Sequence, residues 1–158
     1  MVVNNLSNNF VIIARDASID TNDNMVSIFK MFDQFAFGVN KSELEEAMKK
    51  QVAAVNIPFS CVLCSSWSTD EVVEKNLKLT LEYSILDPEG DVISKGSQGV
   101  EIAKGSDTLR FNLNVEGFGY KGDGRYRYVL RALDDTGQEL ATGFAHLRVS
   151  CIEEPEAA

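Results

Sequence analysis

Residues 124–149 constrain the fold more than any other part of this sequence. Apolar and charged side chains alternate along the first arm of this stretch, which is the period-two signature of a half-buried antiparallel strand. The turn at residues 134–137 ends in Gly137, which suits the left-handed residue of a type I turn followed by a G1 bulge. The stretch therefore predicts a β-hairpin. A hairpin with one apolar face is not stable alone, so we expect the rest of the chain to supply a second layer.

The second arm of this hairpin raises a question of register. The turn geometry directs Leu140 and Thr142 inward, whereas the later alternation directs Ala145, Leu147 and Val149 inward. A bulge at Gly143 would satisfy both patterns. The outer face of the hairpin would then be basic and edged with aromatic rings, and it would carry Arg125, Arg127, Arg131, Phe144, His146 and Arg148.

Other segments of the chain read as further strands. A first hairpin is expected at residues 10–39, with arms 10–20 and 25–37 joined by turn residues at 21–24. Later strands are expected at residues 59–67, 77–86, 91–99 and 108–116, with a glycine-rich loop at 117–124. One short helix is expected at residues 40–52, because Asn40 and Glu43 form a capping-box pattern ahead of an apolar stripe. We expect that stripe to pack on the chain's own sheet, although a partner-binding helix is the alternative.

These elements predict an all-β fold, an antiparallel β-sandwich of Ig-like or C2-like layout. It has about eight strands and one short inserted helix. The sandwich should span residues 10–149, between a flexible segment at 1–9 and an acidic tail at 150–158. Seven residues should share one core: Tyr126, Tyr128, Leu130, Leu79, Leu81, Phe111 and Leu113.

Composition limits the class of partner. The net charge of −9 and pI near 4.6 oppose nucleic-acid binding, which depends on lysine and arginine contacts to phosphates. The first residues show no basic region before an apolar run, so neither a signal peptide nor a membrane span is expected. The odd count of three cysteines agrees with reduced thiols and a cytoplasmic location.

Catalytic chemistry finds no support in the residue pattern. Cys61 and Cys64 match a C-x-x-C spacing, but on a strand residues three apart point to opposite faces and cannot chelate one metal. The single histidine, His146, has no recognisable nucleophile context beside it. We therefore expect a non-enzyme with no cofactor and no small-molecule substrate.

Several segments together resemble a bacterial domain-of-unknown-function family of small β-sandwich proteins. The likeness is carried by FVIIARDASID, MVSIFKMFDQF, IPFSCVLC, LEYSILDPEGDVI and GRYRYVLRALDDTGQELATGFAHLRV, and it covers most of residues 10–149. It implies a cytosolic sandwich and no active-site residues. The helix at 40–52 and the acidic tail are departures from the pattern.

Two functional hypotheses remain. The first is an interaction module that binds a protein partner, or a copy of itself as a homo-oligomer, through a sheet face or edge. Its expected surface is the basic outer face of the last hairpin, because arginine and aromatic residues are enriched in interfaces. The alternative is a C2-like calcium site, in which loops at 21–24, 68–76, 103–107 and 134–137 share one end. Its candidate ligands are Asp20, Asp23, Asp70, Asp134 and Asp135, with Glu71 and Asp107 near them.

Overall fold

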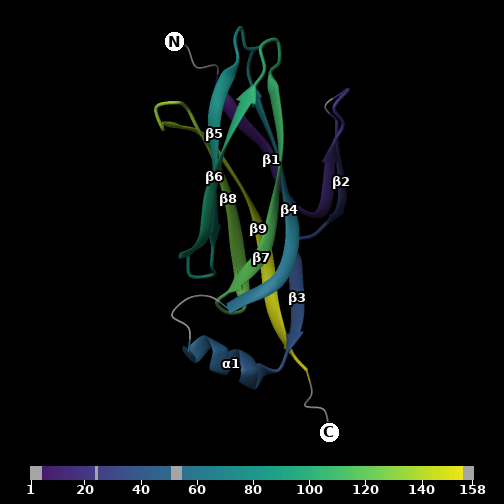
Figure 1. The fold of residues 1–158 in the computed structure, drawn as a ribbon, viewed down its shortest axis with the longest axis vertical. Helices are drawn as coiled ribbons and strands as arrows, with labels where there is room; N and C mark the ends of the chain where they lie inside the picture. Colours follow the sequence, from purple (N-terminus) through teal and green to yellow (C-terminus); the bar gives the residue numbers. More distant parts are fainter. Residues whose placement is uncertain (1–4, 24, 51–54, 155–158) are drawn as a thin grey trace.

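The computed structural model describes residues 5–23, 25–50 and 55–154, and it shows two β-sheets packed face to face (Figure 1). The first sheet has the strand order β2-β1-β4-β7 and the second has the order β3-β9-β8-β5-β6. The elements are β1 (Leu6–Ile19), β2 (Val26–Met31), β3 (Gln34–Val39), α1 (Lys41–Lys50), β4 (Val55–Thr69), β5 (Leu77–Leu86), β6 (Val92–Ile102), β7 (Thr108–Tyr120), β8 (Gly124–Leu133) and β9 (Glu139–Glu153). The predicted β-sandwich is confirmed.

The described residues form nine strands, because the expected strand at 25–37 is two strands in different sheets. The chain changes layers at Phe32 and Asp33. The Phe32 amide donates to the Ile13 carbonyl in the first sheet at 3.1 Å, and the Arg148 amide donates to the Asp33 carbonyl in the second at 2.8 Å. From there β3 runs parallel to β9, from Gln34 opposite Arg148 to Val39 opposite Glu153. The prediction of one strand was wrong, since its apolar residues serve two layers.

Both predicted ends of the sandwich were also too short. β1 begins at Leu6, within the segment expected to be flexible, and it pairs with β4 from Leu6 opposite Thr69. β9 continues to Glu153, because pairing with β3 holds the first residues of the expected acidic tail in the second sheet. β7 likewise extends to Tyr120 through the start of the expected glycine-rich loop. Residues 1–4 and 155–158 lie outside the described part of the chain.

The seven predicted core residues all face the space between the sheets, but they divide between two clusters. One cluster lies towards the helical end of the sandwich and includes Tyr126 and Tyr128, with Leu113 packed against it. The other surrounds Trp67 and includes Leu79, Leu81 and Leu130, with Phe111 packed against it. Trp67 is fully buried, so it is a central residue and not the margin of the core. Its indole nitrogen donates to the hydroxyl of Ser65 at 2.9 Å, which satisfies its one polar group.

The last hairpin keeps one register from Gly124 opposite Val149 to Ala132 opposite Ala141. The predicted bulge at Gly143 is therefore wrong, and the shift lies nearer the turn, between Ala132 and Leu133. Thr142 is exposed opposite Arg131, not inward as expected. Gly143 has a different role: a Cβ there would collide with the side chain of Asn8, so this glycine permits the close approach of β1 and β9. Gly137 has the predicted positive φ, 84°.

The tyrosine at the start of β8 fixes the connection from β7. The hydroxyl of Tyr126 donates to the carbonyl of Gly122 at 2.9 Å and accepts from the amide of Lys121 at 2.8 Å. A buried tyrosine that bonds to backbone a few residues upstream is the tyrosine corner of Ig-like sandwiches. This corner favours the Ig-like layout over the C2-like one.

The helix α1 closes one end of the sandwich (Figure 1). It is shorter than the expected 40–52, and residues 51–54 lie outside the described part of the chain. The side chain of Asn40 accepts from the amide of Ser42 at 3.1 Å, which caps the first turn. Leu44 is buried and belongs to the same cluster as Tyr126. Leu44 of the apolar stripe therefore packs on the chain's own core, as expected, whereas Met48 of the same stripe is exposed.

Candidate functional site

The residues predicted to form a basic face do lie together on the outer side of β8 and β9. Arg125 is opposite Arg148, Arg127 is opposite His146, and Phe144 is opposite Val129. Directly opposed residues of an antiparallel pair point to the same side of a sheet. Their alternation with buried neighbours such as Tyr126 and Leu147 places this side away from the core. Three arginines, one histidine and one phenylalanine form what we term the cationic face: Arg125, Arg127, Phe144, His146 and Arg148.

Arg131 belongs to the same side of the sheet but has a different environment. Its guanidinium contacts Glu82 at 2.6 Å and Glu139 at 3.4 Å, so both neighbouring strands supply a carboxylate. These contacts raise the pKa of Arg131, chiefly through the hydrogen bond to Glu82. Arg131 therefore neutralises acidic residues on its own sheet and is not available to a partner in the same way as the other arginines. In the described part of the chain, no ion pair involves Arg125, Arg127 or Arg148.

His146 connects the aromatic and cationic parts of this face. Its ring meets that of Phe144 edge to face, with centroids 5.3 Å apart. Partial burial lowers its pKa, and the charges of Arg125 and Arg127 lower it further. Its buried Nδ1 has no hydrogen-bond partner among the described residues. A neutral imidazole beside two guanidinium groups can take up a proton when an anion arrives.

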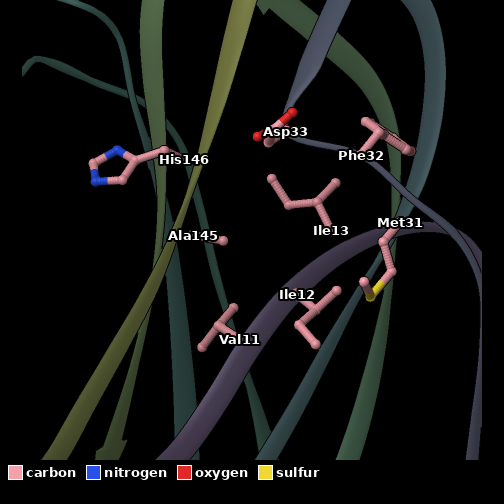
Figure 2. A pocket seen from close by; sticks show the side chains of 8 residues that line it. All are labelled: Val11, Ile12, Ile13, Met31, Phe32, Asp33, Ala145 and His146. Atoms are coloured by element: carbon pink, nitrogen blue, oxygen red, sulfur yellow. The ribbon is translucent and has the colours of Figure 1, made fainter.

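A hollow of about 510 Å³ opens beside this face, where the chain changes layers. Figure 2 shows that the imidazole of His146 points away from the other labelled side chains. Apolar side chains of β1 and the methyl group of Ala145 line the hollow, and Asp33 supplies a carboxylate at its rim. Histidine and aspartate therefore do not converge on one point, and the hollow presents no acid–base pair.

The candidate calcium ligands are not brought together. Asp20 follows the last residue of β1, and Asp70 follows the last residue of β4. The Asp134 carboxylate accepts the amides of Thr136 and Gln138 within its own turn. Within residues 5–23, 25–50 and 55–154, no group of three or more histidine, cysteine, aspartate or glutamate residues could hold a metal ion. Figure 1 shows the β1–β2 turn in the upper part of the molecule with the other turns, but at its margin, so the acidic side chains do not converge on one point.

The cysteines of the C-x-x-C spacing point to opposite sides of β4. Cys61 lies in the cluster between the sheets, and Cys64 lies with Ala14 and Val62 on the outer side of the first sheet. Burial raises the pKa of Cys61 to about 11, so its thiol stays protonated at neutral pH. The polar group next to the Cys61 thiol is the hydroxyl of Tyr128. This hydroxyl has no nitrogen or oxygen partner among the described residues, and a thiol is only a weak hydrogen-bonding partner for it. Both thiols are structural by these criteria.

One exposed apolar group was not singled out in the sequence. Met25, Phe29 and Met31 are 63%, 52% and 64% exposed on or beside β2. The aromatic and methionine residues of this segment are visible in the sequence, but their pattern does not show that they lie outside the core. The exposure of these three side chains becomes visible only in the structure, where β2 lies at the edge of its sheet.

The fold and the geometry together define an Ig-like β-sandwich with a cationic sheet face on an acidic protein. No family model matches the chain, and no curated protein matches it. No helix in the described part of the chain is long and apolar enough to cross a membrane.

Solved structures give distant similarities. A Bacteroides uniformis β-glucuronidase 2, bound to cyclophellitol-6-carboxylate aziridine, is 14% identical with a TM-score of 0.49, over 62% of this chain and 12% of that one. A β-glucuronidase from glycoside hydrolase family 2 is 14% identical with a TM-score of 0.44, over 61% and 11%. The N-terminal domain of PorA is 9% identical with a TM-score of 0.32, over 89% and 97%. This chain thus spans about an eighth of each β-glucuronidase, and these similarities carry no functional argument.

Proposed function

We propose that this chain is a non-catalytic interaction module whose cationic face binds an acidic segment of a protein partner. The observation that carries the proposal is the direct opposition of Arg125 to Arg148 and of Arg127 to His146, without a carboxylate between them. Like charges placed directly opposite each other, as Arg125 and Arg148 are, destabilise a sheet. A chain of net charge −9 has enough acidic residues to neutralise them, as Glu82 neutralises Arg131. An anionic partner would remove this repulsion on binding.

The chemistry of the face favours a peptide carrying carboxylates and an apolar side chain. Each guanidinium offers a planar fork of donors that matches a carboxylate. The ring of Phe144 is 55% exposed and offers apolar contact area beside these donors. The overall negative charge opposes an extended polyanion such as nucleic acid, so a short acidic segment fits best.

A fluorescent peptide with six glutamates and one tryptophan tests the proposal by anisotropy. We expect the wild-type chain to bind it and the Arg127→Glu, Phe144→Ser double variant to lose at least tenfold in affinity. Added salt should weaken wild-type binding, because exposed charges are screened. Circular dichroism would check that the variant remains folded.

Lys104→Glu is the matched control, because it makes the same charge change at an exposed position in the loop between β6 and β7. It should bind the peptide nearly as well as the wild type. An equal loss in this control would show that only net charge matters. A folded double variant with wild-type affinity would exclude this face as the binding surface.

A further inference from the structure

The outer half of the β1–β2 hairpin has little cover, since its Ala17 and Ile28 are only partly buried against Ala14, Val62 and Cys64. β4 pairs with β1 only as far as Ala14, whereas β2 pairs with β1 from Ala14 to Ile19. Beyond Ala14 the two strands therefore form a two-stranded ribbon at one margin of the sandwich (Figure 1). A ribbon of this kind is marginal in water, and its free edge presents unpaired backbone groups to another strand.

The free edge of this ribbon also carries most of its apolar side chains outside any core. Met25, Ser27 and Phe29 alternate along the chain, so they share one side of β2. Met25 and Phe29 are more than half exposed. Lys30 has a φ of 53°, which interrupts the extended conformation before Met31. The segment that can pair regularly is therefore centred on Ser27.

The pattern about Ser27 is complementary to itself. Met25 lies two residues before Ser27 and Phe29 lies two residues after it. If two copies of β2 pair antiparallel about a two-fold axis at Ser27, Met25 of each copy lies directly opposite Phe29 of the other. Such a pair brings a methionine sulfur against an aromatic ring, which is a favourable contact. The small serines meet at the axis between these two pairs.

Charge also favours a second copy at this edge. Two chains of net charge −9 repel each other, so contact is least costly where carboxylates are few. β2 contains one charged residue, Lys30, and no acid. Asp16, which lies opposite Phe29, is on β1, one strand back from the free edge. The edge is thus one at which two such acidic chains can meet without pairing carboxylates.

We propose that β2 is a self-association edge, at which two copies pair antiparallel about Ser27. The contact joins two four-stranded sheets into one continuous sheet across a two-fold axis. It covers Met25 and Phe29 of both copies. It is separate from the cationic face, which lies on the second sheet.

Disulfide cross-linking tests the register directly. Directly opposed residues of an antiparallel pair have Cα atoms about 4.5–5.5 Å apart, which is within disulfide range. Ser27→Cys, oxidised with diamide, should give a covalent dimer on a non-reducing gel. Ser18→Cys is the matched control, because Ser18 is exposed and opposite Ser27 but lies on β1, away from the axis. Both variants retain the three native cysteines, which controls for their reaction. No dimer from Ser27→Cys, or equal dimer from both variants, would overturn the proposal.

Sedimentation equilibrium of the unmodified chain tests association without a cross-link. The mass should rise from 17.4 kDa towards twice that value as concentration increases. Phe29→Lys should remain monomeric over the same range. Val72→Lys is its control, because Val72 is 53% exposed, close to the 52% of Phe29, and it lies in a loop away from this edge. A monomer at all concentrations, or a Phe29→Lys chain that associates like the wild type, would refute self-association.

The two proposals are distinguishable. Arg127→Glu, Phe144→Ser should still associate, and Phe29→Lys should still bind the acidic peptide. A double variant that becomes monomeric would place the self-association surface on the cationic face and not on β2.

Discussion

The first and last hairpins of this chain have similar lengths but different environments. The β8–β9 hairpin lies between β5 and β3 in the second sheet, and its inner side includes fully buried Tyr126, Tyr128 and Leu147. The β1–β2 hairpin shares its first strand with β4 only up to Ala14, and its outer half is exposed on the side of Phe29 and only partly buried on the side of Ile28. Both have turns held by aspartate: Asp134 accepts the amide of Thr136, and Asp20 accepts that of Asn22. Turn chemistry is therefore common to both, whereas the second layer is not.

This difference shows where stability and binding capacity reside. The last hairpin can carry opposed arginines on its outer side because burial of its inner side supplies the free energy that holds the strands together. The first hairpin has little buried area beyond Ala14, so its free edge is the part that gains most from a partner. A rigid face and a poorly covered edge are thus two different kinds of interaction surface on one sandwich.

Matched truncations should give the largest contrast between the hairpins. Leu130 of β8 is 1% exposed, so Leu130→Ala should lower the free energy of unfolding by about 2–5 kcal/mol. Ile28 of β2 is only partly buried, and Ile28→Ala should cost about 1 kcal/mol or less. Urea unfolding of both variants measures the two values. Equal losses would mean that the ribbon belongs to the core as fully as β8 does.

A smaller effect is expected at the tyrosine corner that begins the last hairpin. Tyr126→Phe removes the hydroxyl that bonds Gly122 and Lys121 and leaves both backbone groups without it. The free energy of unfolding should fall by about 1–3 kcal/mol. Tyr83→Phe is the control, because the Tyr83 hydroxyl makes no hydrogen bond among the described residues. A loss of similar size in the control would indicate that ring packing, not the corner, is responsible.

The smallest effect concerns pH and the outer side of the same hairpin. The pKa of His146 is lowered in the folded chain from its ordinary 6.5. At a pH between the pKa of His146 in the folded chain and its pKa in the unfolded chain, the unfolded chain binds more protons than the folded one. The free energy of unfolding therefore falls as the pH drops through about 6.5. Melting temperatures at pH 7.5 and 5.5 should therefore differ less in His146→Gln than in the wild type. An identical difference in both proteins would exclude His146 as the cause.

Alternation predicted the last hairpin well because one side of it meets the core along its full length. The opposed basic residues, the turn with Gly137 and the inward tyrosines followed from this pattern. The position of the register shift, between Ala132 and Leu133, did not follow from the alternation. Gly143 suggested a bulge from its residue type alone, whereas its small size accommodates Asn8 of a strand 135 positions earlier. Sequence spacing contains no information on that contact.

The strand boundary at Phe32 and Asp33 illustrates the same limit. Apolar residues continue from β2 into β3 without a proline or glycine, so local propensity does not mark the change of sheet. Parallel pairing with β9 decides where β3 begins, and this partner lies more than a hundred residues away.

The sequence by itself determined an all-β chain, the alternation that separates inner from outer side chains, and the turns, because these depend on neighbouring residues. Only the tertiary structure decided which sheet each early strand joins, which arginines have carboxylate partners and which apolar residues lack cover. Those outcomes depend on strands that are distant in sequence and adjacent in space, where the hydrophobic effect and hydrogen bonding select among pairings that local patterns leave equally acceptable.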